Sequence, residues 1–233
     1  MTETQGTQGA QGTGGIEDLQ IPGVWVNTPR VFPDDRGEFL EWFKADLVAE
    51  KLGYPLDIPQ ANLSTSREGV VRGIHYADVP PGQAKYVTCV AGRILDVVVD
   101  LRRGSPTYGR HAVVELDAEN RRGLYLPVGV GHGFIVPAGT PQATVCYLVS
   151  EGYNPGAEHG VNPLDPAIGI SWQASGLDES AFVLSDKDRD APAVADVEAT
   201  LPSYDDCLGW EQELRDTWTY ATREAEDWAG EPE

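Results

Sequence analysis

Side chains that could carry acid–base chemistry lie close together in residues 71–86, VRGIHYADVPPGQAKY. His75 can accept and return protons near neutral pH, because an unperturbed imidazole has a pKa of about 6.5. Arg72 and Lys85 add two cations to the same segment. In a regular strand Arg72 and His75 would point to opposite faces, so they share a site only if Gly73 allows a bulge or the strand ends there. The spacing therefore permits a proton-transfer site, and a purely structural role for His75 stays open.

The sequence lacks the usual metal and cofactor motifs. One common metal site on β-barrel folds has the pattern H-x-H followed by a glutamate, but the residues YAD follow His75. The three cysteines lie far apart without a CxxC pair, which argues against a zinc site or a disulfide framework and fits a reducing cytoplasm. There is no G-x-G-x-x-G or Walker sequence and no Ser-His-Asp order. We therefore expect neither a metal nor a cofactor.

Other candidate residues are weaker when each is taken alone. Arg36 follows two aspartates and precedes a glycine, which is typical of a turn. Tyr147 lies in an apolar run, where a tyrosine is usually buried with its hydroxyl bonded. Lys187 and Asp188 belong to the charged run DKDRD, which is typical of solvated surface. The residue types alone leave both a structural and a functional role open for each.

The elements that would position these side chains are mostly short strands. Six alternating or apolar runs, separated by turn residues, are found at 85–90, 93–101, 111–117, 123–127, 133–137 and 143–149. The first two runs meet at Ala91-Gly92, which predicts two strands joined by a tight turn. The only convincing helix before the C-terminal region lies near 44–52. This pattern predicts an all-β fold, an antiparallel sandwich or barrel with few helices.

The C-terminal region has a different character. Residues 203–233 carry ten acidic side chains against Arg215 and Arg223, a net charge of −8. Apolar residues recur at three- and four-residue spacing over 209–228, which predicts an amphipathic helix. We expect this helix to pack on the barrel or at a subunit contact.

The N-terminal region is polar and irregular. Residues 2–14 are rich in Gly, Thr and Gln without a periodic apolar face, so we expect a disordered leader and a domain that starts near Ile21. The expected organisation is a leader (1–20), one β domain (21–202) and an acidic helical tail (203–233).

The net charge of −20 excludes several partners. Nucleic acids require clustered Lys and Arg, so we expect no nucleic-acid binding. No run approaches the roughly 20 apolar residues that cross a bilayer, and the acidic helix lacks a basic polar face, so we expect no membrane partner. No basic residue precedes Arg30 and no apolar h-region is found, which predicts a cytoplasmic location. An anionic substrate would need local arginines that override the overall charge.

Several segments, taken in order, resemble the dTDP-4-dehydrorhamnose 3,5-epimerase family from about residue 21 to 192. They are DDRGEFLEWF (34–43), QANLSTSREGVVRGIHYADVPPGQAKYV (60–87), GRILDVVVDLRRGSPTYGR (92–110), LPVGVGHGF (126–134), YNPGAEH (153–159), DPAIGISW (165–172) and LSDKD (184–188). The resemblance implies a cupin-like antiparallel jelly-roll barrel. It also implies a homodimer whose N-terminal strands reach across the interface. Gly131 departs from the alanine that is common in the family, and the site should tolerate this change.

The resemblance also implies roles for individual residues. His75 matches the base, Asp188 the carboxylate that orients it, and Tyr147 the acid on the opposite face of the sugar. Lys85 resembles the lysine near the C4 ketone, where its charge would stabilise an enolate. The other matching positions bind substrate: Arg36, Glu41, Gln60, Asn62, Arg72, His132, Glu158 and Lys187.

The implied reaction converts dTDP-4-keto-6-deoxy-D-glucose to dTDP-4-keto-L-rhamnose by inversion at C3 and C5, without metal or cofactor. Relatives in antibiotic or other deoxysugar pathways invert only C3 or only C5 and have the same motifs. The choice depends on the position of the sugar ring, which shifts of about 1 Å can change. A non-catalytic sugar-nucleotide-binding cupin is a more distant alternative, because the base, acid and lysine positions are all filled.

Overall fold

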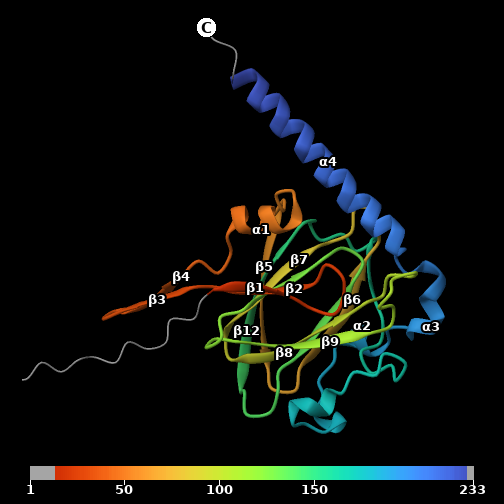
Figure 1. Ribbon diagram of the computed structural model, residues 1–233. Coiled ribbons are helices and arrows are strands. Elements are labelled where there is room, and N and C mark those ends of the chain that lie inside the picture. Colours follow the sequence, from red (N-terminus) through yellow and green to blue (C-terminus); the bar gives the residue numbers. More distant parts are fainter. Residues whose placement is uncertain (1–13, 230–233) are drawn as a thin grey trace, which may run out of the picture.

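Two antiparallel sheets form the body of the protein (Figure 1). This computed structural model describes residues 14–229, with side chains described up to residue 225. The larger sheet has the strand order β1 (Gly15–Asp18), β2 (Trp25–Thr28), β10 (Gly123–Leu126), β7 (Lys85–Ala91), β12 (Gln142–Val149) and β5 (Gln60–Arg67). The smaller sheet has the order β13 (Glu158–Gly160), β6 (Val71–Ala77), β11 (Gly131–Ile135), β8 (Arg93–Val99) and β9 (His111–Asp117). The predicted antiparallel all-β architecture is confirmed.

The main core lies between the two sheets. Val87 and Val145 from the larger sheet meet Ile94 and Val98 from the smaller one, and all four are almost fully buried. Alternation along β8 places Val97 and Val99 on the opposite face, in a second core. Apolar residues therefore cover both faces of β8. Polar side chains can line the space between the two sheets only beyond the end of the main core.

The prediction that 85–90 and 93–101 form a hairpin is wrong in its pairing, although both strands exist. β7 pairs with β10 and β12, whereas β8 pairs with β11 and β9. The chain passes from one sheet to the other at Gly92, whose φ is +73°. A Cβ atom there would lie 2.2 Å from the carbonyl oxygen of Gln142, so the turn requires glycine. The local sequence identifies where the chain turns, but the long-range pairing of each strand decides which sheet it joins.

Helices and coil cover parts of the outer faces of both sheets. On the larger sheet, α1 (Ala45–Leu52) packs Val48 against a cluster that contains Trp25, Tyr86 and Tyr125, which confirms the predicted helix near 44–52. On the smaller sheet, Trp172 and Leu201 from the C-terminal segments are buried against Ile135 and its neighbours. These segments contain η1 (Trp172–Ser175), η2 (Glu179–Ala181), α2 (Asp186–Arg189), α3 (Val194–Val197) and η3 (Glu198–Thr200).

A two-stranded hairpin projects from the side of the barrel (Figure 1). It consists of β3 (Val31–Asp34) and β4 (Gly37–Leu40), which pair only with each other in the described part of the chain. Phe32 and Phe39 are exposed on it, Phe39 to 64%. Two exposed phenyl rings on an isolated hairpin indicate a contact surface.

The chain ends differ from the prediction at one boundary. β1 pairs with β2 through four consecutive residue pairs, so the boundary at residue 20 is wrong and the sheet begins at Gly15. Backbone pairing along the sheet edge orders this segment without a periodic apolar face. The rest of the predicted leader, residues 1–13, lies outside the described residues.

The predicted C-terminal helix is confirmed and begins five residues earlier, as α4 (Tyr204–Ala229). Its first half packs on the barrel, with Cys207 buried and Trp210 half-buried, and its second half extends away from the barrel (Figure 1). Among the described residues, no helix is long and apolar enough to cross a membrane.

Candidate active site

A cavity of about 470 Å³ opens between the two sheets. It is lined by Gln60, Asn62, Ser64, Arg72, His75, Gln83, Lys85, His132, Gly133, Phe134, Val145, Tyr147, Tyr153 and Glu158. Most of these residues lie on strands of both sheets, so the site is held by the barrel itself.

β5 supplies one wall of the cavity by reversing the usual polarity of a strand. Its alternate residues Gln60, Asn62 and Ser64 face the cavity, whereas Leu63 on the other face is 65% exposed. Gln60 Nε2 donates a hydrogen bond of 2.7 Å to Asn62 Oδ1. A strand with polar residues inside and an apolar residue outside indicates a ligand surface inside and a contact surface outside.

A bulge in β6 brings Arg72 and His75 to the same cavity. Opposite β11, His132 pairs with His75 and Phe134 with Arg72, so two residues of β6 are accommodated against one of β11. Gly73 makes this possible, because its φ is +110° and a Cβ atom there would lie 2.5 Å from the carbonyl oxygen of His132. The bulge required for a shared site is therefore present.

His75 is held by a buried carboxylate. Its Nε2 lies 2.6 Å from Oδ1 of Asp188, which is 5% exposed at the start of α2. Burial alone would raise the pKa of Asp188, but the hydrogen bond and charge of His75, helped by the Ser185 hydroxyl and the Gly73 backbone N–H, hold it below its ordinary value. An ionised Asp188 fixes the orientation of the imidazole and leaves the other ring nitrogen for a ligand.

Lys85 is a buried cation in the same cavity. It shares the inward face of β7 with Val87 and Cys89, and burial lowers its pKa to about 8, opposed by the negative charge of Glu158. Desolvation strengthens the interaction of the ammonium group with any negative charge that develops beside it.

Tyr147 lies on β12, opposite Asn62 on one side and Val87 on the other. Burial raises the pKa of Tyr147, with Arg72 opposing and Glu158 adding to the shift. The phenol therefore keeps its proton at neutral pH and can donate it. Arg72 is oriented by a hydrogen bond of 3.0 Å from its Nε to Ser66 Oγ.

Comparison with known proteins identifies the family of this chain. The profile of the family described as dTDP-4-dehydrorhamnose 3,5-epimerase matches residues 18–196. The chain belongs to the dTDP-4-dehydrorhamnose 3,5-epimerase family. The predicted family and the predicted epimerase class of enzyme are confirmed.

Relatives within this epimerase family are named for inversion at two carbons or at one. The dTDP-4-dehydrorhamnose 3,5-epimerase of Streptomyces griseus is 48% identical over 85% of this chain and 97% of its own length. The dTDP-4-dehydrorhamnose 3-epimerase of Streptomyces niveus is 51% identical over 82% of this chain and 90% of its own. A crystal structure of dTDP-6-deoxy-D-glucose-3,5-epimerase RmlC from Legionella pneumophila in complex with dTDP-4-keto-L-rhamnose superposes with a TM-score of 0.75, at 37% identity, over 82% of this chain and 98% of that one. The predicted cupin-type fold is confirmed by such similarities.

Three of the predicted site residues of this epimerase-family chain lie outside the cavity. Arg36 is 90% exposed at the tip of the hairpin and pairs with Asp34. Glu41 follows the hairpin and lies 3.5 Å from Lys44. Lys187 is exposed on α2, next to Asp188, and is not among the lining residues. The other nine predicted residues line the cavity or, for Asp188, bond a residue that does.

The cavity also contains residues that sequence reasoning missed. Ser64, Gln83, Phe134 and Tyr153 line the cavity. Asp96 forms a hydrogen bond with His132, which is also a lining residue. The one usable signal was Asp96, an acidic residue in the middle of an otherwise apolar strand. In the described residues, no group of three or more His, Cys, Asp or Glu side chains is arranged to hold a metal ion.

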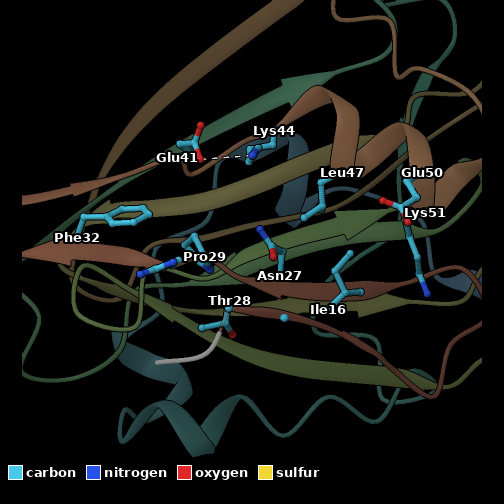
Figure 2. A pocket seen from close by; sticks show the side chains of 13 residues that line it. Ile16, Asn27, Thr28, Pro29, Phe32, Glu41, Lys44, Leu47, Glu50 and Lys51 are labelled. Atoms are coloured by element: carbon cyan, nitrogen blue, oxygen red, sulfur yellow. Dashed lines mark ion pairs between the residues drawn. The ribbon is translucent and has the colours of Figure 1, made fainter. Parts of the chain in front are cut away.

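A larger cavity of about 780 Å³ lies elsewhere, between the hairpin, α1 and the edge of the larger sheet. Figure 2 shows Phe32, Leu47 and Ile16 around it, with the Glu41–Lys44 ion pair at its rim. Lys51 at the opposite rim is already paired with Asp18 at 2.7 Å. Ile16, Leu47 and Phe32 give part of its lining an apolar character, which suits a docking surface.

Proposed function

We propose that this chain inverts C3 and C5 of dTDP-4-keto-6-deoxy-D-glucose and releases dTDP-4-keto-L-rhamnose. The observation that carries the proposal is the convergence of the His75–Asp188 pair, Lys85 and Tyr147 on one cavity. This set provides a base, a charge for the enolate oxygen and a proton donor. The chemistry uses side chains only, in the cytoplasm, where the free thiols of the chain remain reduced.

Each inversion is one proton out and one proton in. His75 removes the proton from the carbon next to the C4 ketone, and the electron pair of that C–H bond moves to form a C–C double bond and an enolate oxygen. Lys85 stabilises the oxygen. Tyr147 then delivers a proton to the opposite face of the same carbon, and the carbonyl is restored. The imidazolium and phenolate exchange protons with water, and the same groups act at the second carbon after the ring has moved.

The remaining lining residues fit the rest of the substrate. Arg72 provides positive charge for a diphosphate in a chain whose net charge is −20. Gln60 and Asn62 offer hydrogen bonds to sugar and nucleoside, and His132 offers one to the sugar. Glu158, which accepts hydrogen bonds from Gln83 Nε2 and the backbone N–H of Asn154, holds the loop at the cavity mouth.

We further propose a homodimer in which the hairpin of one subunit reaches the cavity of the other. β5, the cavity wall, is the last strand of its sheet, and its exposed Leu63 offers a surface to the phenyl rings of a second hairpin. The cavity of Figure 2 would receive the corresponding edge of the partner. This arrangement gives Arg36 and Glu41 a role in substrate binding that neither has within one chain, and Lys187 meets the diphosphate from α2.

The alternative is inversion at C3 alone. It is favoured by the relative from Streptomyces niveus, whose name assigns only that carbon. The two reactions use the same first step, so the base and the lysine do not distinguish them.

The test is isotopic. The protein is incubated with dTDP-4-keto-6-deoxy-D-glucose in D₂O, and deuterium at C3 and C5 is followed by NMR and mass spectrometry. Deuterium at both carbons with formation of the L-sugar is the expected result. Deuterium and inversion at C3 alone would establish the alternative, and no exchange in folded protein would refute the catalytic proposal.

A further inference from the structure

A second histidine–carboxylate pair lies beside the first. His132 Nε2 is 3.0 Å and 2.9 Å from the two carboxylate oxygens of Asp96. Asp96 is completely buried on β8, and its side chain points into the core between Ile94 and Val98. His132 lines the active-site cavity from β11. The pair therefore connects the apolar core to the site.

Packing does not explain Asp96. A carboxylate in an apolar core is unfavourable, and burial raises the pKa of Asp96 against the opposing effect of His132. Among the described residues, no lysine or arginine forms an ion pair with it. Replacement of both members of such a buried pair by apolar side chains is often neutral or stabilising, so packing alone does not require the carboxylate. We therefore attribute the presence of this carboxylate to its hydrogen bond with His132.

The hydrogen bond determines which atom of His132 is available. Because Asp96 accepts from Nε2, the ring atom left for a ligand is Nδ1, for which the described residues provide no hydrogen-bond partner. His132 is the direct cross-strand partner of His75, and such neighbours have Cβ atoms about 5 Å apart. His132 therefore lies beside His75, the proposed base.

We propose that Asp96 is a positioning residue that orients His132, so that Nδ1 holds an oxygen of the sugar ring while His75 and Tyr147 move protons. The inference rests on the proposed function and adds to it. Groups that orient a residue in direct contact with substrate typically contribute 10- to 100-fold to activity. Their loss should lower kcat, because the nucleoside and diphosphate contacts are made elsewhere.

The experiment compares Asp96→Leu and Asp96→Asn with the unmodified full chain. Asp96→Leu should lower kcat by about 10- to 100-fold while the Kd for dTDP, measured on folded protein, changes less than about threefold. Asp96→Asn retains an oxygen that accepts from Nε2–H and should recover part of the lost kcat. In ¹⁵N NMR spectra, His132 should show a proton on Nε2 in the unmodified protein and a mixture of tautomers in Asp96→Leu.

A matched control is available at the surface. His159 Nε2 lies 2.9 Å from Asp78 Oδ1 outside the cavity lining, so Asp78→Leu removes a similar pair and should leave kcat unchanged. A kcat within about threefold of the unmodified value in Asp96→Leu, or an Asp96→Asn variant no faster than Asp96→Leu, would overturn the proposal. If the unmodified protein itself exchanges no deuterium, the proposed function fails, whereas the NMR result still tests the link between Asp96 and His132.

Discussion

The Nε2 of His75 lies 2.6 Å from Oδ1 of Asp188, a residue 113 positions later in the chain. The histidine comes from a strand of the barrel and the aspartate from a short helix of the C-terminal segment. Asp188 is also held by the Ser185 hydroxyl, which accepts a hydrogen bond from its backbone N–H at 3.1 Å. The C-terminal segment therefore supplies a partner to a cavity histidine and does not only cover the sheet.

Replacement of this carboxylate should slow proton removal. We expect Asp188→Asn to lower the rate of deuterium wash-in by about 10- to 100-fold, because the ring of His75 loses its orienting charge. Asp186→Asn on the same helix is the control, since Asp186 is exposed and pairs only with Arg189. Equal rates for the two variants would mean that Asp188 has no part in the base.

Tyr147→Phe should separate exchange from inversion. His75 can still remove a proton and return a solvent deuteron on its own face, so wash-in should fall less than formation of inverted product. We expect product formation to drop by about 100-fold or more. The two rates are read from one reaction in D₂O by mass spectrometry and NMR. Equal loss of both would assign Tyr147 a different role.

Lys85 should give the pH profile its alkaline limb. Burial lowers the pKa of Lys85 from an ordinary value of 10.5 to about 8, so the ammonium group is lost as the pH rises through 8 and kcat/KM should fall above that pH. Stability should change in the opposite direction. Between pH 8 and about 10 the unfolded chain binds more protons at this lysine than the folded one, so the contribution of Lys85 to the free energy of unfolding rises with pH.

Lys85→Met should remove both effects. We expect turnover to fall by about 100-fold or more, because the enolate oxygen loses its cation. At pH 7 the melting temperature should rise by about 2–6 °C, since a buried charge has been removed. Calorimetry at pH 7 and 10 together with turnover measurements checks this. A lower melting temperature at pH 7 would show that the charge of Lys85 is well compensated.

The proposed exchange of hairpins predicts complementation between inactive subunits. In a mixed dimer of Arg36→Ala and His75→Ala chains, one cavity has an intact His75 and receives an intact Arg36 from its partner. Co-expression with two different tags should therefore restore up to about half of the activity per dimer, although each homodimer is impaired. No restoration in a purified mixed dimer, or a monomeric mass for the unmodified protein, would contradict the arrangement.

Removal of the distal part of α4 should be tolerated. Among the side chains described up to residue 225, the last on this helix with a tertiary hydrogen bond is Arg215, whose Nε donates to the carbonyl oxygen of Leu52 at 2.9 Å. A chain that ends after Asp216 should melt within about 2 °C of the full chain and keep its turnover. A chain that ends after Gly209 also loses Trp210 and should melt several degrees lower. A large loss on the first truncation would mean that the distal half has a partner in the assembled protein.

The sequence predicted strands better than their pairing. Alternation identified β8 and its two faces, because one residue in two points to each core. It could not show that β7 and β8 belong to different sheets, since this depends on pairings with β10, β12, β11 and β9. The boundary at residue 20 was wrong for a similar reason, because backbone pairing with β2 orders β1 without any apolar pattern.

The site was predicted mainly through resemblance. Spacing required a bulge at Gly73 before Arg72 and His75 could share a cavity, and the bulge is found. Spacing gave no indication that Asp188 would reach His75, because that contact depends on the path of more than a hundred intervening residues. The same limitation applies to Asp96, whose partner His132 is brought to it only by the pairing of β8 and β11.

The reversed polarity of β5 and the bulge of β6 place much of the chemistry in one short piece of chain. Residues 60–75 contribute Gln60, Asn62, Ser64, Arg72 and His75 to the fourteen that line the cavity. This segment, the 60–75 cassette, runs from β5 in the larger sheet to β6 in the smaller one. It therefore contains parts of two opposite walls of the cavity. Chimeras that exchange this cassette with a relative of different product stereochemistry would transfer five lining residues together with Val71 and Ile74 of the second core. The products of such chimeras would show whether these two walls determine the number of carbons that are inverted.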